Sequence, residues 1–139
     1  MYTFRPYTER VARLRDAVRD RLMVADAAKS RLQLEALKKY LDANFAFTKE
    51  YLSAHLPKAR FAIPEATYLA WVDLSDYFAP GEDLPDFFAY KAGVLLEGGD
   101  TLLVGNANRF VRLNLAMPRS VLRTGLERMR DAINARDAE

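Results

Sequence analysis

The sequence of 139 residues contains no cysteine. Without cysteine the chain can form no disulfide bond, offers no thiolate nucleophile and has no cysteine ligand for zinc. Its single histidine, His55, excludes a metal site built from several histidines and leaves little material for a catalytic dyad. The chain also lacks a run of about 20 apolar residues, the length that a membrane-spanning helix needs, and no secretory signal is readable at its start. We therefore expect a cytoplasmic protein.

Neither sign of charge is in large excess, because 21 basic residues stand against 19 acidic ones and the formal net charge is +2. This balance does not suggest a nucleic-acid-binding protein. Arginine outnumbers lysine fifteen to six, which favours planar, bidentate contacts with carboxylate or phosphate wherever an arginine is functional. Most of the arginines are nevertheless expected on solvated helix faces. The length suits about one domain, and half of the residues are hydrophobic.

Apolar residues recur at helical spacing in the first part of the chain. One stripe, over residues 11–22, predicts a helix of about 15 residues with Thr8 as its N-terminal cap. A longer stripe predicts a second helix over residues 27–55, ended by Pro57. That helix is long for a small globular domain, so it would suit a link between two bodies or pairing with another helix. The longer stripe consists of Leu34, Leu37, Leu41, Phe45, Thr48, Leu52 and Leu56.

Beyond Pro57 the pattern changes to short strands separated by turn residues. Strands are predicted over residues 60–63, 67–74, 94–96 and 110–116, a short helix over 86–92 that stops at Gly93, and a last helix that opens at Pro118. The turns between paired strands are too short for parallel crossovers. The predicted fold class is therefore α+β, with N-terminal helices that include one long helix, then a small, mainly antiparallel sheet with covering helices.

Arg112 is the one charged residue with an unusual setting, because it stands in the middle of the otherwise apolar stretch FVRLNL. Under strict alternation Val111, Leu113 and Leu115 share one face of the strand, and Arg112 and Asn114 share the other. A guanidinium in that setting either extends to water or is directed at a carboxylate. The spacing leaves both interpretations open.

The other polar candidates have plainer interpretations. His55 lies near the end of the long predicted helix, where a surface or capping role suits it. The stretch 97–100 is more typical of a tight turn than of an anion-binding loop, because it lacks the lysine and serine of a phosphate-binding P-loop. Lys29 stands in helical sequence, which disfavours a Schiff-base role.

Three stretches occur in order along the chain: PEATYLAWVD at residues 64–73, KAGVLLEGG at 91–99 and FVRLNLAMPR at 110–119. Together they resemble the C-terminal small domain of fold-type I pyridoxal-phosphate enzymes, the class I/II aminotransferase superfamily. The resemblance is nearest to the cystathionine β-lyase and C–S lyase branch. Residues 41–57 also resemble the interdomain helix of that family. Ala66 is a departure, because the family often has glycine there.

The resemblance implies a role for the arginine in the third stretch. In the family this arginine makes a bidentate salt bridge to the α-carboxylate of the amino-acid substrate, so Arg112 would do the same. It should then project from the sheet face away from the packed helices, with its head group partly open to solvent. Tyr68 and Trp71 would lie near the substrate entrance, although packing in the core of the small domain is equally open for both.

The resemblance also implies what this chain lacks. The family's lysine that forms the internal aldimine, the aspartate that pairs with the pyridine nitrogen, the aromatic that stacks on the ring and the phosphate-binding loop lie in a large domain, for which 139 residues have no room. We therefore expect no cofactor in this chain, although the parent family uses pyridoxal phosphate, and no catalysis by the chain alone. Residues 1–35 form an unassigned helical segment, and residues 36–139 form the aminotransferase-like small domain.

Three functional hypotheses follow. The first is an isolated, truncated small domain of a pyridoxal-phosphate-dependent C–S β-lyase or aminotransferase. The second is a non-enzymatic oligomerisation module, in which Leu34, Leu37, Leu41 and Phe45 are buried against another chain. The third is a small independent enzyme, which the lack of cysteine and the single histidine disfavour. The expected partners are the missing large domain or a second copy of the chain, with an amino-acid substrate in the parent enzyme, and neither nucleic acid nor a membrane.

Overall fold

The computed structural model describes residues 5–99, 101, 102 and 107–138, and for residues 5–28 it describes the backbone alone. The chain divides into two compact units, residues 1–39 and residues 40–139. This division does not test the assignment of residues 36–139 to one family domain, which stays a prediction.

From Arg5 to His55 the chain is helical without interruption. Helix α1 spans Arg5–His55 and contributes to both units. The prediction of two helices, with Thr8 as a cap, is wrong, because Thr8 lies inside α1 and no break occurs between the two apolar stripes. The physical reason is that the sequence between the stripes, MVADAAK, contains neither proline nor glycine and is rich in alanine, the strongest helix former. No described helix is long and apolar enough to cross a membrane.

Four short strands form one sheet in the second unit. In spatial order they are β1 (Arg60–Phe61), β2 (Leu69–Asp73), β4 (Phe110–Asn114) and β3 (Glu97–Gly98). Every neighbouring pair is antiparallel. The predicted α+β class with an antiparallel sheet is therefore confirmed.

The third strand lies three residues later than predicted. Residues 94–96 were expected to form it, but they form a connection, and β3 occupies the stretch that was expected to be a turn. The end of the preceding helix is the same in the prediction and in the structure. Helix α2 (Leu84–Phe87) continues into the π-helix η1 (Phe88–Ala92), and Gly93 ends it in the left-handed conformation at φ 61° and ψ 34°, as predicted. The chain therefore needs residues 94–96 to return to the edge of β4.

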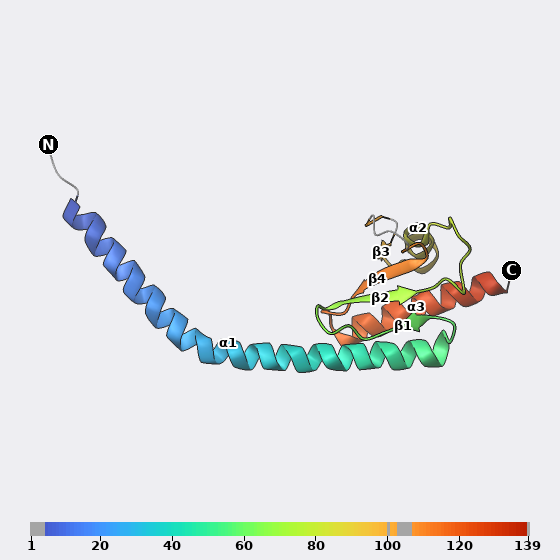
Figure 1. The fold of residues 1–139 in the computed structure, drawn as a ribbon, viewed down its shortest axis with the longest axis horizontal. Helices are drawn as coiled ribbons and strands as arrows, with labels where there is room; N and C mark the ends of the chain where they lie inside the picture. Colours follow the sequence, from blue (N-terminus) through green and yellow to red (C-terminus); the bar gives the residue numbers. More distant parts are fainter. Residues whose placement is uncertain (1–4, 100, 103–106, 139) are drawn as a thin grey trace. The chain divides into compact units, whose positions relative to one another are not determined.

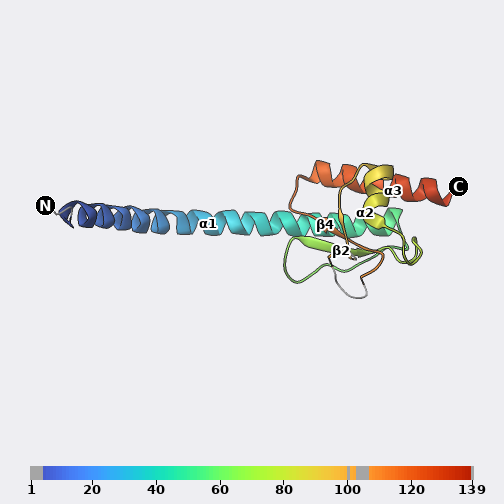
Figure 2. The ribbon, with the colours of Figure 1, turned by 90° about the horizontal axis from the view of Figure 1, so that it is seen from above.

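Two helices cover one face of the sheet. The part of α1 in this unit, residues 40–55, and helix α3 (Arg119–Asp137) lie side by side (Figures 1 and 2). Aromatic and arginine side chains connect them, since the guanidinium carbons of Arg119 and Arg123 lie 5.0 and 4.8 Å from the ring centre of Phe47. The face of α3 that was predicted to be apolar is buried in the core: Leu122, Leu126, Met129 and Ile133.

The strand residues alternate between a buried and an open face. In β2 Ala70 and Val72 are buried, and in β4 Val111 and Leu113 are buried, so all four contribute to the core. The intervening residues, Arg112 among them, lie on the other face and are partly or fully exposed. The alternation predicted for the fourth strand is therefore confirmed.

The core takes up part of the long apolar stripe of α1. Phe45 is only 4% exposed and packs in the same cluster as Leu52 and Leu56. The expectation that Phe45 is buried against another chain is therefore wrong, because its partners belong to its own unit. By contrast, Leu34 and Leu37 are each 49% exposed. The stripe thus has a packed half and an exposed half.

Candidate functional site

Arg112 occupies the centre of β4, between two neighbouring strands. Its backbone partner in β2 is Trp71, and its backbone partner in β3 is Glu97. Directly opposed residues on adjacent antiparallel strands have side chains on the same face, close enough to interact. The sheet register therefore places one aromatic ring and one carboxylate beside the guanidinium.

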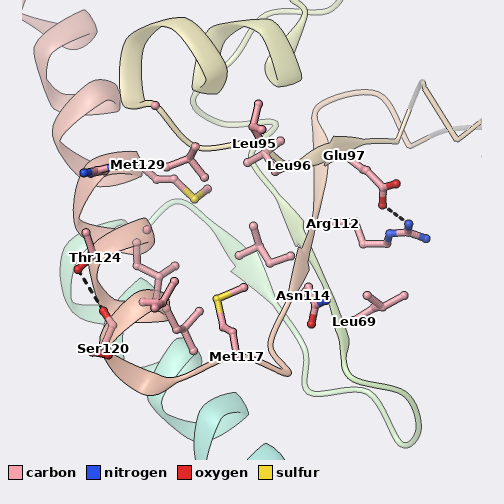
Figure 3. Close-up of a pocket in the computed structure, with 18 of the residues that line it drawn as sticks. Leu69, Leu95, Leu96, Glu97, Arg112, Asn114, Met117, Ser120, Thr124 and Met129 are labelled. Atoms are coloured by element: carbon pink, nitrogen blue, oxygen red, sulfur yellow. Dashed lines mark hydrogen bonds and ion pairs between the residues drawn. The ribbon is translucent and has the colours of Figure 1, made fainter.

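Both neighbours contact the Arg112 side chain. Its Nη2 donates to Oε2 of Glu97 in an ion pair (Figure 3). Its guanidinium carbon lies 6.0 Å from the ring centre of Trp71, within the range of a cation–π interaction. The Arg112 side chain is 24% exposed and the Glu97 side chain 53% exposed. The pair is therefore in contact with solvent rather than enclosed in the core.

One buried hydrogen-bond donor of Arg112, its Nε, has no acceptor in the described part of the chain. An arginine presents five N–H donors in a rigid fork that matches the two oxygens of a carboxylate. Glu97 pairs with Nη2, and the neighbouring Nε is covered, so a second bond at Nε requires the side chains around it to move. Chemically, this arrangement can bind a planar anion on the open face of the sheet.

Figure 3 shows on which side of the sheet this group lies. Arg112 and Leu69 are on one side of the strands, whereas Met117 and Met129 lie between the sheet and α3. Arg112 thus projects away from the packed helices with its head group partly open to solvent, the orientation expected from its position in the sequence. Its role at a substrate is not decided by this orientation.

Trp71 lies on this open side as well, because it alternates with the buried residues Ala70 and Val72. Tyr68 immediately precedes β2 and is exposed, and Trp71 is half-buried. Neither belongs to the hydrophobic core cluster. Core packing was the open alternative for both aromatics, and the described core does not include them. Their position near a substrate entrance remains a prediction.

A cavity of about 780 Å³ lies beside this group. Its walls come from Tyr68 and Leu69 at the start of β2, from residues 93–97, from β4 and from the first half of α3, and its lining is mostly apolar (Figure 3). Arg112, Glu97 and Tyr68 are part of the lining, together with Leu95, which is 91% exposed. Sequence reasoning missed this cavity because three distant segments form it. Its one local signal is the consecutive apolar run VLL at residues 94–96, which was assigned to a strand.

Pyridoxal phosphate is the cofactor that the sequence resemblance implies, and its aldehyde needs an amine held in an enclosed site. All six lysines of the chain are exposed, and none is among the described residues that line the cavity. No group of three or more histidine, aspartate or glutamate residues in the described part of the chain could hold a metal ion. The described residues therefore do not fit the covalent attachment of this cofactor.

The remaining polar candidates have structural surroundings. His55 is exposed in the last turn of α1, with its ring centre 4.4 Å from that of Tyr51, which agrees with a surface role. Lys29 is exposed in α1. The stretch 97–100 begins with β3, and Oγ1 of Thr101 donates to the carbonyl of Gly98 at 2.8 Å. Asp100, its last residue, lies outside the described residues.

Comparison with known proteins finds relatives for most of the chain. It is 33% identical over 101 residues to the cystathionine β-lyase PatB of Bacillus subtilis strain 168, a match that covers 73% of this chain and 26% of that protein. It is 35% identical over 103 residues to the protein MalY of Escherichia coli K12, with the same two shares. No protein-family model matches the chain.

A solved structure extends this similarity to the fold. The C–S lyase from Staphylococcus hominis, in its pyridoxal-phosphate-bound form, matches with a TM-score of 0.71 and 44% sequence identity. The match covers 76% of this chain and 28% of that one. The chain therefore spans about a quarter of the length of the curated relatives that it matches.

Proposed function

This chain is a homologue of the C-terminal region of pyridoxal-phosphate-dependent cystathionine β-lyases and C–S lyases with the aminotransferase fold, and on that premise we propose that it works as the small domain of such an enzyme. In this proposal Arg112 binds the α-carboxylate of an amino-acid substrate. The cofactor and the residues that react with it belong to a large domain outside this sequence. The chain by itself supplies substrate binding and no catalysis.

The surroundings of Arg112 carry this proposal. Its guanidinium lies on the open face of the sheet, beside Trp71, with a buried Nε that has no partner in the described part of the chain. Bidentate pairing with a carboxylate uses two such donors at once, which fixes the direction of the ligand as well as binding it. Holding a substrate in one orientation is the main contribution that a domain without the reacting groups can make to a reaction.

The two aromatic residues have supporting roles in this proposal. Trp71 covers one side of the Arg112 guanidinium, and Tyr68 stands at the margin of the adjoining cavity. When the domain closes against its partner, both rings would exclude water from the bound carboxylate, and exclusion of water strengthens an ion pair. The exposed apolar residues around the cavity, such as Leu95 and Val121, are the surface that a large domain would cover.

Trp71 provides the test, because it is the only tryptophan and its ring faces Arg112. We expect titration of the full chain with L-alanine to change the Trp71 fluorescence saturably, with a dissociation constant on the order of millimolar. The substitution Arg112→Gln should abolish the change, because the carboxylate loses its donors. Circular dichroism of each variant checks that the fold is retained.

A second arginine offers a matched control. Arg136 pairs with Glu82 at 3.0 Å and lies outside the cavity lining. Arg136→Gln should therefore leave the titration unchanged. If Arg112→Gln and the wild type give the same curve, Arg112 is not the carboxylate anchor and the proposal fails.

A second candidate function is self-association through α1. Leu32, Leu34 and Leu37 are 74%, 49% and 49% exposed within six residues of one helix. Leu34 and Leu37 are three residues apart and share one side of that helix. Exposed leucines at this spacing favour pairing with the helix of another copy. The two functions are compatible, because self-association through residues 29–39 uses a different unit from Arg112.

A further inference from the structure

The carboxylate of Glu97 already occupies the guanidinium that the proposed function assigns to the substrate. Glu97 is held opposite Arg112 by the backbone register of β3 and β4, not by a long flexible loop. The contact joins Oε2 of Glu97 to Nη2 of Arg112. A substrate carboxylate therefore meets a guanidinium whose Nη2 is already paired with Glu97.

The contact uses only part of what Arg112 offers. The Nε–H and one N–H of Nη2 lie parallel on the same side of a guanidinium, so together they form the side-on fork for a carboxylate. Glu97 takes Nη2, and Nε has no acceptor in the described part of the chain. A carboxylate that reached both donors would make one hydrogen bond more than Glu97 makes. Because Nε is covered in this structure, that exchange requires the side chains around it to move first.

After the exchange Glu97 stays close to the ligand. Its backbone is fixed in β3, and its side chain, 53% exposed, has room to turn toward solvent. Its negative charge then stands within a few ångströms of the bound carboxylate. Like charges at that distance repel, so a ligand with a second carboxylate near the first is disfavoured.

We propose that Glu97 is a built-in counter-ion of Arg112, which competes with the substrate carboxylate and selects amino acids with a single carboxylate near the α-carbon. This inference rests on the proposed function of Arg112 and adds a specificity-determining residue to it. Glu97 acts through Arg112, so it is a positioning residue. The adjoining apolar cavity agrees with this selection, because Leu95 and Leu96 line it next to Glu97.

The substitution Glu97→Gln tests the inference in the full chain, with Trp71 fluorescence at constant ionic strength as the readout. Exposed ion pairs are weak, so loss of this competition should lower the dissociation constant of L-alanine about two- to fivefold. The dissociation constant of L-aspartate should fall by a larger factor, because the repulsion of its second carboxylate is removed too. The ratio of the two constants is a readout that a purely structural Glu97 would not change.

Glu82→Gln is the matched control. It removes the same charge from another glutamate–arginine pair, that of Arg136, which lies outside the cavity lining. This variant should bind both amino acids as the wild type does. If Glu97→Gln loses the fold by circular dichroism, Glu97→Ser replaces it in the same titration.

The outcomes separate this inference from the proposed function. If binding depends on Arg112 but Glu97→Gln leaves both constants unchanged, the counter-ion role is wrong and the carboxylate anchor stands. If no variant responds to either amino acid, the anchor and the counter-ion role both fail. A twofold or greater tightening for L-alanine, with a larger one for L-aspartate, supports the inference.

Discussion

At the scale of single residues, one buried amide connects α1 to the segment between β4 and α3. Nδ2 of Asn44 donates to the carbonyl oxygens of Leu115 at 2.7 Å and Met117 at 3.1 Å. Its Oδ1 accepts from Nε of Arg119 at 2.7 Å. Asn44 is fully buried, so water cannot replace these bonds. The amide therefore fixes the start of α3, and with it the helix that forms one wall of the cavity.

We expect Asn44→Ala to lower the free energy of unfolding by about 2–4 kcal/mol, because it leaves buried polar groups without partners. Urea unfolding followed by circular dichroism measures the loss. The control is Asn134→Ala, since Asn134 is exposed on α3 and alanine is a good helix former. That variant should change stability by less than about 0.5 kcal/mol. Equal effects of the two substitutions would show that the Asn44 bonds do not stabilise the fold.

At the scale of the element, the side chains of α1 that the structure describes, residues 29–55, fall into two halves. Residues 45–55 supply Phe45 and Leu52 to the core, whereas every described side chain from residue 29 to residue 40 is exposed. A helix without a packed face gains little stability from its own sequence. The exposed half would therefore gain more from burial against a second copy than the packed half would.

If self-association uses this half, the wild-type chain should sediment as a dimer at tens of micromolar, and the double substitution Leu34→Gln with Leu37→Gln should convert it to a monomer. The reason is the apolar area that both leucines would bury, at roughly 25 cal/mol for each Å². Analytical ultracentrifugation gives the result. Leu95→Gln removes a leucine that is exposed outside α1 and should leave the dimer intact. A wild type that is monomeric at these concentrations contradicts the second candidate function.

At the scale of the whole molecule, no lysine belongs to the cavity next to Arg112 as far as the structure describes its lining. The six lysines are exposed. A pyridoxal-phosphate enzyme needs an amine that holds the cofactor and a group that orients the substrate, both at one place, since the cofactor carries the difficult chemistry. In our proposal this chain supplies only the group that orients the substrate.

Incubation with pyridoxal phosphate followed by borohydride reduction should therefore label several lysines weakly, with no dominant site. Exposed amines of ordinary reactivity react with the aldehyde at similar rates. Peptide mapping by mass spectrometry measures how the label is distributed among the lysines. Lys91→Arg removes the lysine closest in sequence to the cavity segment that starts at Gly93, and the other five should label as before. One lysine that carries most of the label would mean that this chain holds its own cofactor site, against the proposal.

Much of the fold was predictable because its signals are local. The alternation around Arg112, the apolar face of α3 and the stop at Gly93 each depend on a few consecutive residues, whose backbone geometry fixes which side chains share a face. The limits of α1 and β3 were not predictable from the sequence. The helix continues through an alanine-rich stretch that contains no break, and β3 occupies residues 97–98, which the adjacent glycines predict to be a turn.

The sequence by itself determined the α+β class, the sheet face on which Arg112 lies and the family resemblance, because periodicity and short motifs are properties of neighbouring residues. Only the tertiary structure decided what surrounds that arginine. Glu97 is fifteen residues away and Trp71 forty-one, and both meet Arg112 because strand register is set by loop closure and packing over the whole unit. For the same reason Phe45 lies in the core of its own unit, and the cavity exists only where three distant segments come together.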